Sequence, residues 1–312
     1  MDGRILYLVH DNPSPSGGIK NIYEHVLHLS KAGFPAFVVH SGEGFRPAWF
    51  DRDVPILYTG KNFQVMPRDA LVIPEDFAAA LLAVKGVPAK KFVFCQNHFY
   101  IFAGLPDGET WRSLNIDGVI ASSDQIRSFV EGALGYNDVP VVPYAIRPDI
   151  FRSEPKNLRI AVMPRKRSFE VKFIHDAFRQ VFREHADVPW AVLDGAPEEE
   201  VARALRQSAV FLSMNRFEGF GLPPVEAMAC GCIVVGFHGW GGLDYARGDN
   251  GFWCAEENLT ECVNKLGEVC TLLKQGSERI TQMRRRAAET AAGYGPERQR
   301  EILLDFWRKV MA

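Results

Sequence analysis

The chain has 312 residues, of which 47% are hydrophobic and 24% are charged, and its formal net charge is −2. This profile is typical of a globular protein with about two domains. The near-neutral charge gives no indication of nucleic-acid binding, and no stretch approaches the ~18 consecutive apolar residues that a membrane span needs.

The opening residues and the cysteines both favour a cytoplasmic protein. The first ten residues, MDGRILYLVH, lack the basic region and cleavage site of a signal peptide. The cysteines form no pair at zinc-ligand spacing, and most lie in apolar runs. We therefore expect six reduced, structural thiols and no metal site. They are Cys95, Cys230, Cys232, Cys254, Cys262 and Cys270.

The first half of the chain alternates apolar runs with helical patterns. Aliphatic and aromatic content predicts strands at 4–9, 36–39, 70–73, 91–95 and 118–121, with a short apolar segment at 139–142. Helical spacing predicts a helix that ends at Gly33, one at 77–84 and one at 124–134. This order is typical of βαβ units and hence of a parallel sheet.

Polar residues follow several of these strands, where open α/β sheets bind ligands. Glu75 follows one strand, and residues 96–98 follow another. A Gly-Gly turn, Gly17 with Gly18, precedes the first helix. It is not G-x-G-x-x-G, and no acidic residue ends the second strand, so a dinucleotide site is not indicated. The turn is either a plain tight turn or part of a ligand site, and His98 is either a packed side chain or a site residue.

The second half repeats the alternation after a polar linker at 152–158. Strands are predicted at 159–163, 190–193, 210–212 and 233–236. Helices are predicted at 171–182, 197–207, from 259 onward and at 297–312. Gly195 follows the second of these strands and is a candidate for lining a base pocket. The expected fold class is therefore α/β, with two domains.

The stretch RFEGFGLPPVEAMACG at 216–231 predicts a strand, a glycine-rich loop and a helix N-terminus. We expect Gly219 and Gly221 to adopt positive φ and the two prolines to lie in the first helical turn. The free N–H groups and dipole of such a terminus favour an anion. Glu218 flanks the loop, and Glu226 is expected in the first turn of the helix.

The same string resembles the E-x7-E signature of retaining glycosyltransferases of family four. Glu218 and Glu226 match the two glutamates, with the fill GFGLPPV and the continuation AMACGCIVV. The resemblance implies a GT-B fold, in which two Rossmann-like domains face a cleft. It implies an N-terminal acceptor-side domain at 1–150, a nucleotide-sugar-binding domain at 151–296 and a helix at 297–312 that packs back on the first domain. The segment VPVVPYAIRPDIF also resembles the end of the first domain, but Tyr144 and Ala145 replace the family's Asn-Gly.

The resemblance also implies roles for individual residues. Glu226 would bind the ribose hydroxyls of the donor, while Glu218 and His98 would lie near the donor sugar. The implied catalytic residues are Glu218, His98, Arg165 and Lys166. The implied donor-binding residues are Glu226, Gly17, Gly18, Gly219, Phe220, Gly221, Leu222 and Gly195.

The basic segment MPRKR follows a predicted strand, where it can clamp a diphosphate. The family places a Lys five residues after its Arg, but Glu170 lies five after Arg165 here. We expect Arg165 and Lys166 to serve, with Arg167 and Lys172 as alternatives for the second cation.

The resemblance implies a retaining, metal-independent glycosyltransferase. It would move a sugar from a nucleotide diphosphate donor to a glycan, lipid or small molecule, with no bound cofactor. The alternatives are a non-enzymatic nucleotide-sugar-binding protein, an epimerase or phosphorylase of similar architecture, and a dehydrogenase. The run at 284–286, three arginines, is either a solvated helix face or a peripheral contact with the inner membrane face. The base, sugar, acceptor, linkage and oligomeric state stay open.

Overall fold

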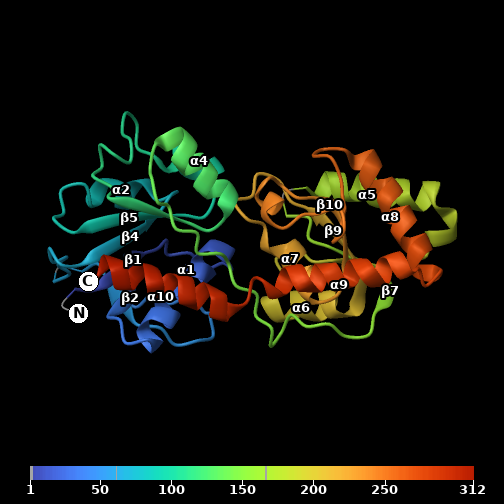
Figure 1. Cartoon of the computed structure of the whole chain (residues 1–312), viewed down its shortest axis with the longest axis horizontal. Coiled ribbons are helices and arrows are strands. Elements are labelled where there is room, and N and C mark those ends of the chain that lie inside the picture. The colour runs from blue at the N-terminus through green and yellow to red at the C-terminus, as the bar shows by residue number, and fades with distance from the viewer. Residues whose placement is uncertain (1–2, 61, 166) are drawn as a thin grey trace. The chain divides into compact units, whose positions relative to one another are not determined.

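A computed structural model describes residues 3–60, 62–165 and 167–312 (Figure 1). The chain divides into two compact units. The N-terminal unit comprises Met1–Tyr144 together with Glu297–Ala312, and the C-terminal unit comprises Ala145–Pro296. The sequence prediction placed the division after residue 150. Each unit is a parallel α/β sheet with helices, as the sequence predicted.

The N-terminal unit has a six-stranded parallel sheet in the order β3-β2-β1-β4-β5-β6. Its strands are β1 (Ile5–Leu8), β2 (Ala36–His40), β3 (Ile56–Tyr58), β4 (Ala70–Pro74), β5 (Lys90–Cys95) and β6 (Gly118–Ala121). The sequence analysis missed β3, a three-residue edge strand. The apolar segment at 139–142 forms no strand, and only Val141 bridges to Ala121.

Helices cover both faces of this sheet, because successive residues of a strand point to opposite sides. Ile5 and Tyr7 pack in the core that includes helices α1 (Gly17–Lys31) and α10 (Pro296–Val310). Leu6 packs in a second core with helices α2 (Ala78–Ala83) and α4 (Asp124–Leu134). The short helices η1 (His98–Tyr100) and α3 (Ile101–Gly104) follow β5.

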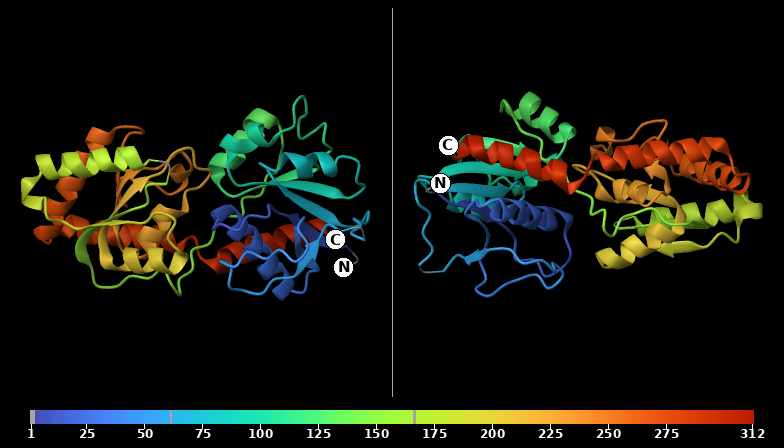
Figure 2. Two further views of the ribbon diagram at one scale, coloured as in Figure 1. Left: turned by 180° about the vertical axis from the view of Figure 1, so that it is seen from behind. Right: turned by 60° about the horizontal axis from the view of Figure 1, so that its bottom comes forward.

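The C-terminal helix α10 belongs to the N-terminal unit, which confirms the predicted return of the chain. Leu303, Leu304 and Trp307 are buried there. The indole N–H of Trp307 donates to the hydroxyl of Tyr7 in β1, at 3.2 Å. The views in Figures 1 and 2 show α10 alongside the strands of this unit. The buried side chain of Gln299 donates from its amide nitrogen to the side-chain oxygen of Asn21 in α1, at 2.8 Å.

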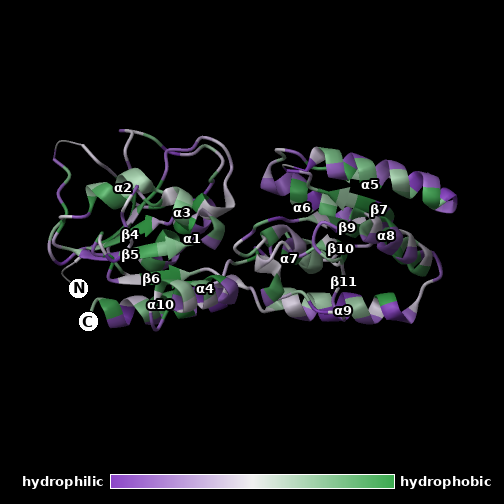
Figure 3. Cartoon of the chain, turned by 90° about the horizontal axis from the view of Figure 1, so that it is seen from above, coloured by the Kyte–Doolittle hydropathy of each residue, from purple (hydrophilic) through white to green (hydrophobic). Residues whose placement is uncertain are grey.

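The C-terminal unit has a five-stranded parallel sheet in the order β11-β10-β9-β7-β8. The strands are β7 (Asn157–Val162), β8 (Trp190–Val192), β9 (Ser208–Met214), β10 (Ile233–Phe237) and β11 (Phe252–Trp253). The helices are α5 (Ser168–Val181), η2 (Arg183–His185), α6 (Glu198–Gln207), α7 (Leu222–Ala229), η3 (Gly241–Asp244), α8 (Leu259–Lys274) and α9 (Glu278–Ala292). Figure 3 shows α5 on one side of this sheet and α9 on the other.

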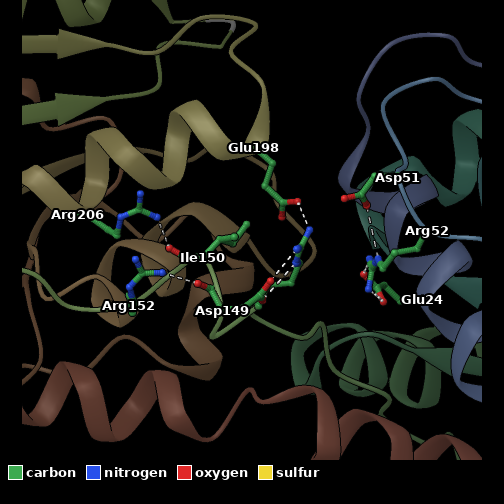
Figure 4. A network of polar contacts seen from close by, with 9 residues as sticks. Glu24, Asp51, Arg52, Asp149, Ile150, Arg152, Glu198 and Arg206 are labelled. Atoms are coloured by element: carbon green, nitrogen blue, oxygen red, sulfur yellow. Dashed lines mark hydrogen bonds and ion pairs between the residues drawn. The ribbon is translucent and has the colours of Figure 1, made fainter.

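Arginine side chains anchor the segment that opens the C-terminal unit (Figure 4). Arg147 pairs with Asp149 at 2.7 Å and with Glu198 at 3.4 Å. Arg206 in α6 donates to the carbonyl of Ile150, at 2.7 Å. These contacts hold residues 147–150 against α6. Within the described ranges, no helix combines the length and the apolar character needed to cross a membrane.

Candidate functional site

The carboxyl edge of the C-terminal sheet gathers four loops, because all its strands run parallel. Residues 163–165 and 167 follow β7, residues 193–197 follow β8, residues 215–221 follow β9 and residues 238–240 follow β10. This is the edge where open α/β sheets bind ligands. The predicted residues of this unit that lie in these loops therefore share one edge of the sheet.

Arg165 and Glu218 meet at this edge. The Nη1 atom of Arg165 lies 2.5 Å from an Oε atom of Glu218. Arg165 has a positive φ of 51°, and its side chain is half-exposed. The main-chain N–H of Glu218 donates to the carbonyl of Gly239 at 2.9 Å, which ties the loop after β9 to the loop after β10. The structure thus brings two of the predicted catalytic residues together.

Gly221 is the N-cap of α7 and has a positive φ of 83°, as predicted. The hydroxyl of the buried Tyr245 donates to its carbonyl at 2.6 Å. A Cβ at this position would lie 2.4 Å from the side-chain nitrogen of Asn215. The prediction of positive φ at Gly219 is wrong, because the left-handed residue on that side of the loop is Phe217, with φ 50°.

Glu226 lies in the second turn of α7, so its prediction in the first turn is wrong. The helix begins at Leu222, because Gly221 caps it before the two prolines. Glu226 is largely buried, with 9% of its surface exposed. Phe220 is also buried, and its ring packs against Tyr294 at 5.0 Å between centroids. Any ligand contact from Phe220 would therefore come from its main chain.

The glycines after β10 allow a close approach between loops. A Cβ at Gly241 would lie 2.4 Å from the carbonyl carbon of Gly219 and 2.5 Å from the carbonyl oxygen of Glu218. Trp240 precedes Gly241 with a positive φ of 68° and is exposed, as is Phe217. Strained, exposed residues that the fold maintains are often functional. Neither aromatic residue was among the predicted site residues.

The alternative cations are engaged elsewhere. Arg167 is buried, pairs with Glu170 at 3.3 Å and with Glu257, and stacks its guanidinium over Phe237 at 4.9 Å. Lys172 is exposed on α5 and pairs with Asp176. Lys166 lies outside the described residues.

Gly195, the last of the predicted donor-binding residues in this unit, follows β8 with a positive φ of 63°. It is exposed, and a Cβ there would meet nothing within 4 Å. The positive φ alone therefore accounts for a glycine at this position, and no ligand contact is needed to explain it. Gly195 lies at the same edge of the sheet as Arg165.

The carboxyl edge of the N-terminal sheet holds the Gly-Gly turn. Gly17 and Gly18 are the first residues of α1, behind the N-cap Ser16. A Cβ at Gly18 would lie 3.2 Å from the side-chain nitrogen of Gln96. The side-chain oxygen of Gln96 in turn accepts the hydroxyl of Tyr144 at 3.0 Å. Gly18 therefore packs against a residue that follows β5.

Glu75 fixes the turn that carries His98. It accepts the main-chain N–H groups of Gln96 and Asn97 at 3.0 and 2.6 Å, and burial raises its pKa to about 8. The His98 ring packs on Phe99 at 4.1 Å between centroids. Partial burial lowers the pKa of His98, which favours the neutral imidazole. Its Nδ1 atom is buried and makes no hydrogen bond to the described residues.

A buried polar chain at the same edge was missed by the sequence analysis. His40 lies between Asp11 and Tyr23, with Nδ1 2.6 Å from the Asp11 carboxylate and Nε2 2.6 Å from the Tyr23 hydroxyl. Asp11 also accepts from Ser41 at 2.5 Å and from the N–H of Gly42 at 2.7 Å. Burial disfavours its charge, but the hydrogen bonds outweigh burial and lower the pKa of Asp11. The sequence did contain one indication of this chain, because Asp11 and Ser41 are polar residues that follow two predicted strands.

Among the residues that the structure describes, no three His, Cys, Asp or Glu side chains are placed to hold a metal ion. The described acidic and basic groups at the C-terminal edge are instead arranged as a cation–carboxylate pair beside a capped helix N-terminus. Such an arrangement can bind an anion and orient a neutral polar group.

Comparisons with known proteins agree on the architecture. Residues 191–291 match the family model described as glycosyl transferases group 1. An alpha-1,6-glucosyltransferase of Actinobacillus pleuropneumoniae is 24% identical over 247 residues, which cover 77% of this chain and 74% of the relative. A glycosyltransferase structure from Rickettsia africae has a TM-score of 0.73 at 14% identity, covering 99% of this chain and 98% of that one.

A third similar structure was solved with a ligand. HepE of Anabaena, in complex with UDP-glucose, has a TM-score of 0.70 at 15% identity and covers 98% of this chain and 99% of that chain. The chain thus has the two-unit GT-B fold, and its residues 191–291 match the family of glycosyl transferases group 1.

Proposed function

We propose that the chain is a retaining glycosyltransferase that uses a UDP-sugar donor, with UDP-glucose as the first candidate. The observation that carries the proposal is the Arg165–Glu218 pair beside the Gly221-capped N-terminus of α7. The family match over 191–291, the glucosyltransferase relative and the UDP-glucose complex of a similar structure support it.

Charge stabilisation is the main task that we assign to the C-terminal unit. Arg165 neutralises the negative charge that grows on the leaving diphosphate. The α7 N-terminus adds the positive end of its dipole, while Pro223 and Pro224 in its first turn carry no N–H. Lys166 is the proposed second cation. Glu226 binds the ribose hydroxyls, and Glu218 orients the sugar.

The proposed reaction needs no protein nucleophile. The bond from the anomeric carbon of the sugar to the diphosphate oxygen breaks, and a bond from the same carbon to an acceptor oxygen forms on the same face. The acceptor proton passes to the leaving diphosphate. Because Arg165 supplies a cation, we propose metal-independent transfer. The acceptor, a glycan, lipid or small molecule, is assigned to the N-terminal unit.

The test measures donor binding and turnover together. Thermal shift with UDP, GDP, ADP, CMP and dTDP identifies the nucleotide, since a ligand at 100 times its Kd adds about 2.7 kcal/mol of stability. UDP release from UDP-glucose then reports turnover. Glu226→Ala should weaken UDP binding about ten- to a hundredfold. Glu199→Ala, which removes an exposed carboxylate in the first turn of α6, is the matched control.

Three outcomes separate the alternatives. UDP binding with turnover, weakened by Glu226→Ala alone, supports the proposal. Binding of a nucleotide-sugar without hydrolysis or transfer to any acceptor favours a non-enzymatic binding protein. Binding of none of the nucleotides removes the donor site from consideration.

A further inference from the structure

A second polar site lies at the opposite edge of the C-terminal sheet. A pocket of about 430 Å³ opens where β7 and β9 begin, lined by Leu158 and Ala209. This amino edge is distinct from the carboxyl edge that holds Arg165. Gly231, which follows the C-cap of α7 with a positive φ of 81°, forms part of the wall. A Cβ there would lie 2.7 Å from the hydroxyl of Ser153, so the glycine keeps this wall open.

Three basic side chains line this pocket without a carboxylate partner among the described residues: Lys156, Lys274 and Arg284. The ammonium of Lys156 donates to the carbonyls of Leu205 and Arg206, at 2.9 and 2.7 Å. Lys274 donates to a main-chain carbonyl, 2.8 Å away. These contacts orient the ammonium groups but leave their charges unbalanced.

The carboxylate in the wall of the pocket balances them only in part. Glu154 lines the pocket, but it is shared by two other cations. It pairs with Arg152 at 3.2 Å and with Arg206 at 3.1 Å. The lining therefore keeps a net positive charge.

Arg284 differs from the two arginines that follow it. Arg285 and Arg286 are exposed and pair with Glu289, at 3.4 and 2.8 Å. Arg284 is half-buried, and its Nε atom is buried with no hydrogen-bond partner within the described ranges. Burial lowers the pKa of Arg284 and that of Lys156. A buried charge without a partner is unfavourable, and an anion in the pocket would relieve that cost.

We propose that this pocket binds a phosphate group, carried by a small metabolite or by a lipid headgroup, independently of the donor site. A guanidinium and two ammonium groups match a phosphate dianion in charge and in hydrogen-bond donors. The volume accommodates a phosphate and a small attached group. The proposal does not rest on the glycosyltransferase activity, because none of the lining residues belongs to the carboxyl edge.

The test uses inorganic phosphate as the soluble probe, at constant ionic strength set with chloride. Phosphatidic acid vesicles, with phosphatidylcholine vesicles as the blank, test the lipid source. Calorimetric titration and vesicle co-sedimentation give the dissociation constants. Arg284→Gln should raise the Kd at least tenfold, while Arg285→Gln, one residue away and with the same charge change, should leave it within twofold.

Two further variants control for binding at the donor edge and for misfolding of Arg284→Gln. Arg165→Gln removes the cation of the donor edge and should leave the affinity for phosphate within twofold. Lys274→Gln, at an exposed lysine, replaces Arg284→Gln if the latter fails to fold, and it should weaken binding at least threefold. Saturable binding of either a soluble probe or acidic vesicles with this pattern supports the proposal and identifies the source. No saturable binding to any probe, an equal loss in Arg285→Gln, or a loss in Arg165→Gln alone would overturn it.

Discussion

The Arg165 guanidinium lies 2.5 Å from the Glu218 carboxylate, although 53 residues separate the two in the sequence. Their loops follow β7 and β9, which are neighbours in the sheet. A diphosphate that approached Arg165 would compete with Glu218 for the same cation. The pair therefore links donor binding to the position of the Glu218 side chain.

Opposite effects of the two single substitutions on UDP affinity follow from this pairing. Arg165→Ala removes a charged hydrogen-bond donor and should weaken UDP binding about ten- to a hundredfold. Glu218→Gln removes the competing charge, so UDP binding should stay equal or become tighter, while turnover of the UDP-sugar falls by about tenfold or more. Titration calorimetry measures the first quantity and UDP release the second. Equal weakening of UDP binding in both variants would contradict the competition.

Gly221→Ala should destabilise the protein well beyond the cost of its backbone conformation. The new Cβ would lie 2.4 Å from the Asn215 side chain and 3.1 Å from the Tyr245 hydroxyl. We expect a loss of about 3 kcal/mol in the free energy of unfolding. Gly276→Ala is the matched control, with φ 62° and nothing within 4 Å, and should cost only about 1–2 kcal/mol. Urea denaturation measures both, and equal losses would show that the contacts with Asn215 and Tyr245 carry no weight.

Much of the fold could be predicted because its strands are buried on both faces. Such strands appear as continuous apolar runs, as in Gly118–Ala121, which is β6. β3 was missed because an edge strand of three residues carries too short a pattern. The segment at 139–142 has the right composition but no strand, since Pro140 and Pro143 lack the N–H that a ladder requires.

The candidate site was predictable only where one local stretch contained it. The loop from Glu218 to the N-cap Gly221 is local, and the positive φ of Gly221 followed from the sequence, whereas that expected at Gly219 did not. Contacts between distant segments were not accessible, such as the hydroxyl of Tyr245 on the Gly221 carbonyl. The basic segment MPRKR did not indicate which of its cations is available to a ligand. Arg167 is engaged by carboxylates from other positions in the sequence, including Glu257.

No cysteine should react with a thiol reagent in the folded protein. All six thiols are free and buried, and none is within a disulfide. Burial raises the pKa of Cys230 to about 12 and that of Cys232 to about 11, so little thiolate forms at neutral pH. Ellman's reagent should detect no thiol in native buffer and six after denaturation. Rapid reaction of one thiol in native buffer would contradict this arrangement.

The buried carboxyl group of Glu75 should make stability fall as the pH rises toward 8. Its folded-state pKa of about 8 exceeds the ordinary value of 4.5, so the folded state holds a proton that the unfolded state releases. The stabilising contribution is complete below about pH 4.5 and is lost as the pH rises through 8. Buried histidines such as His25, with a pKa lowered to about 3, act in the opposite direction, but only below about pH 6.5.

Comparison of the wild type with Glu75→Gln from pH 6.5 to 8 therefore isolates Glu75, because the buried thiols, whose pKa values are also raised, affect both proteins equally. Urea midpoints of the wild type should decrease across this window more steeply than those of Glu75→Gln. The variant also loses one acceptor for the N–H groups of Gln96 and Asn97, which lowers its midpoint by a constant amount rather than by a slope. Parallel curves for the two proteins would mean that Glu75 is ionised in the folded state, held as a carboxylate by those two N–H groups.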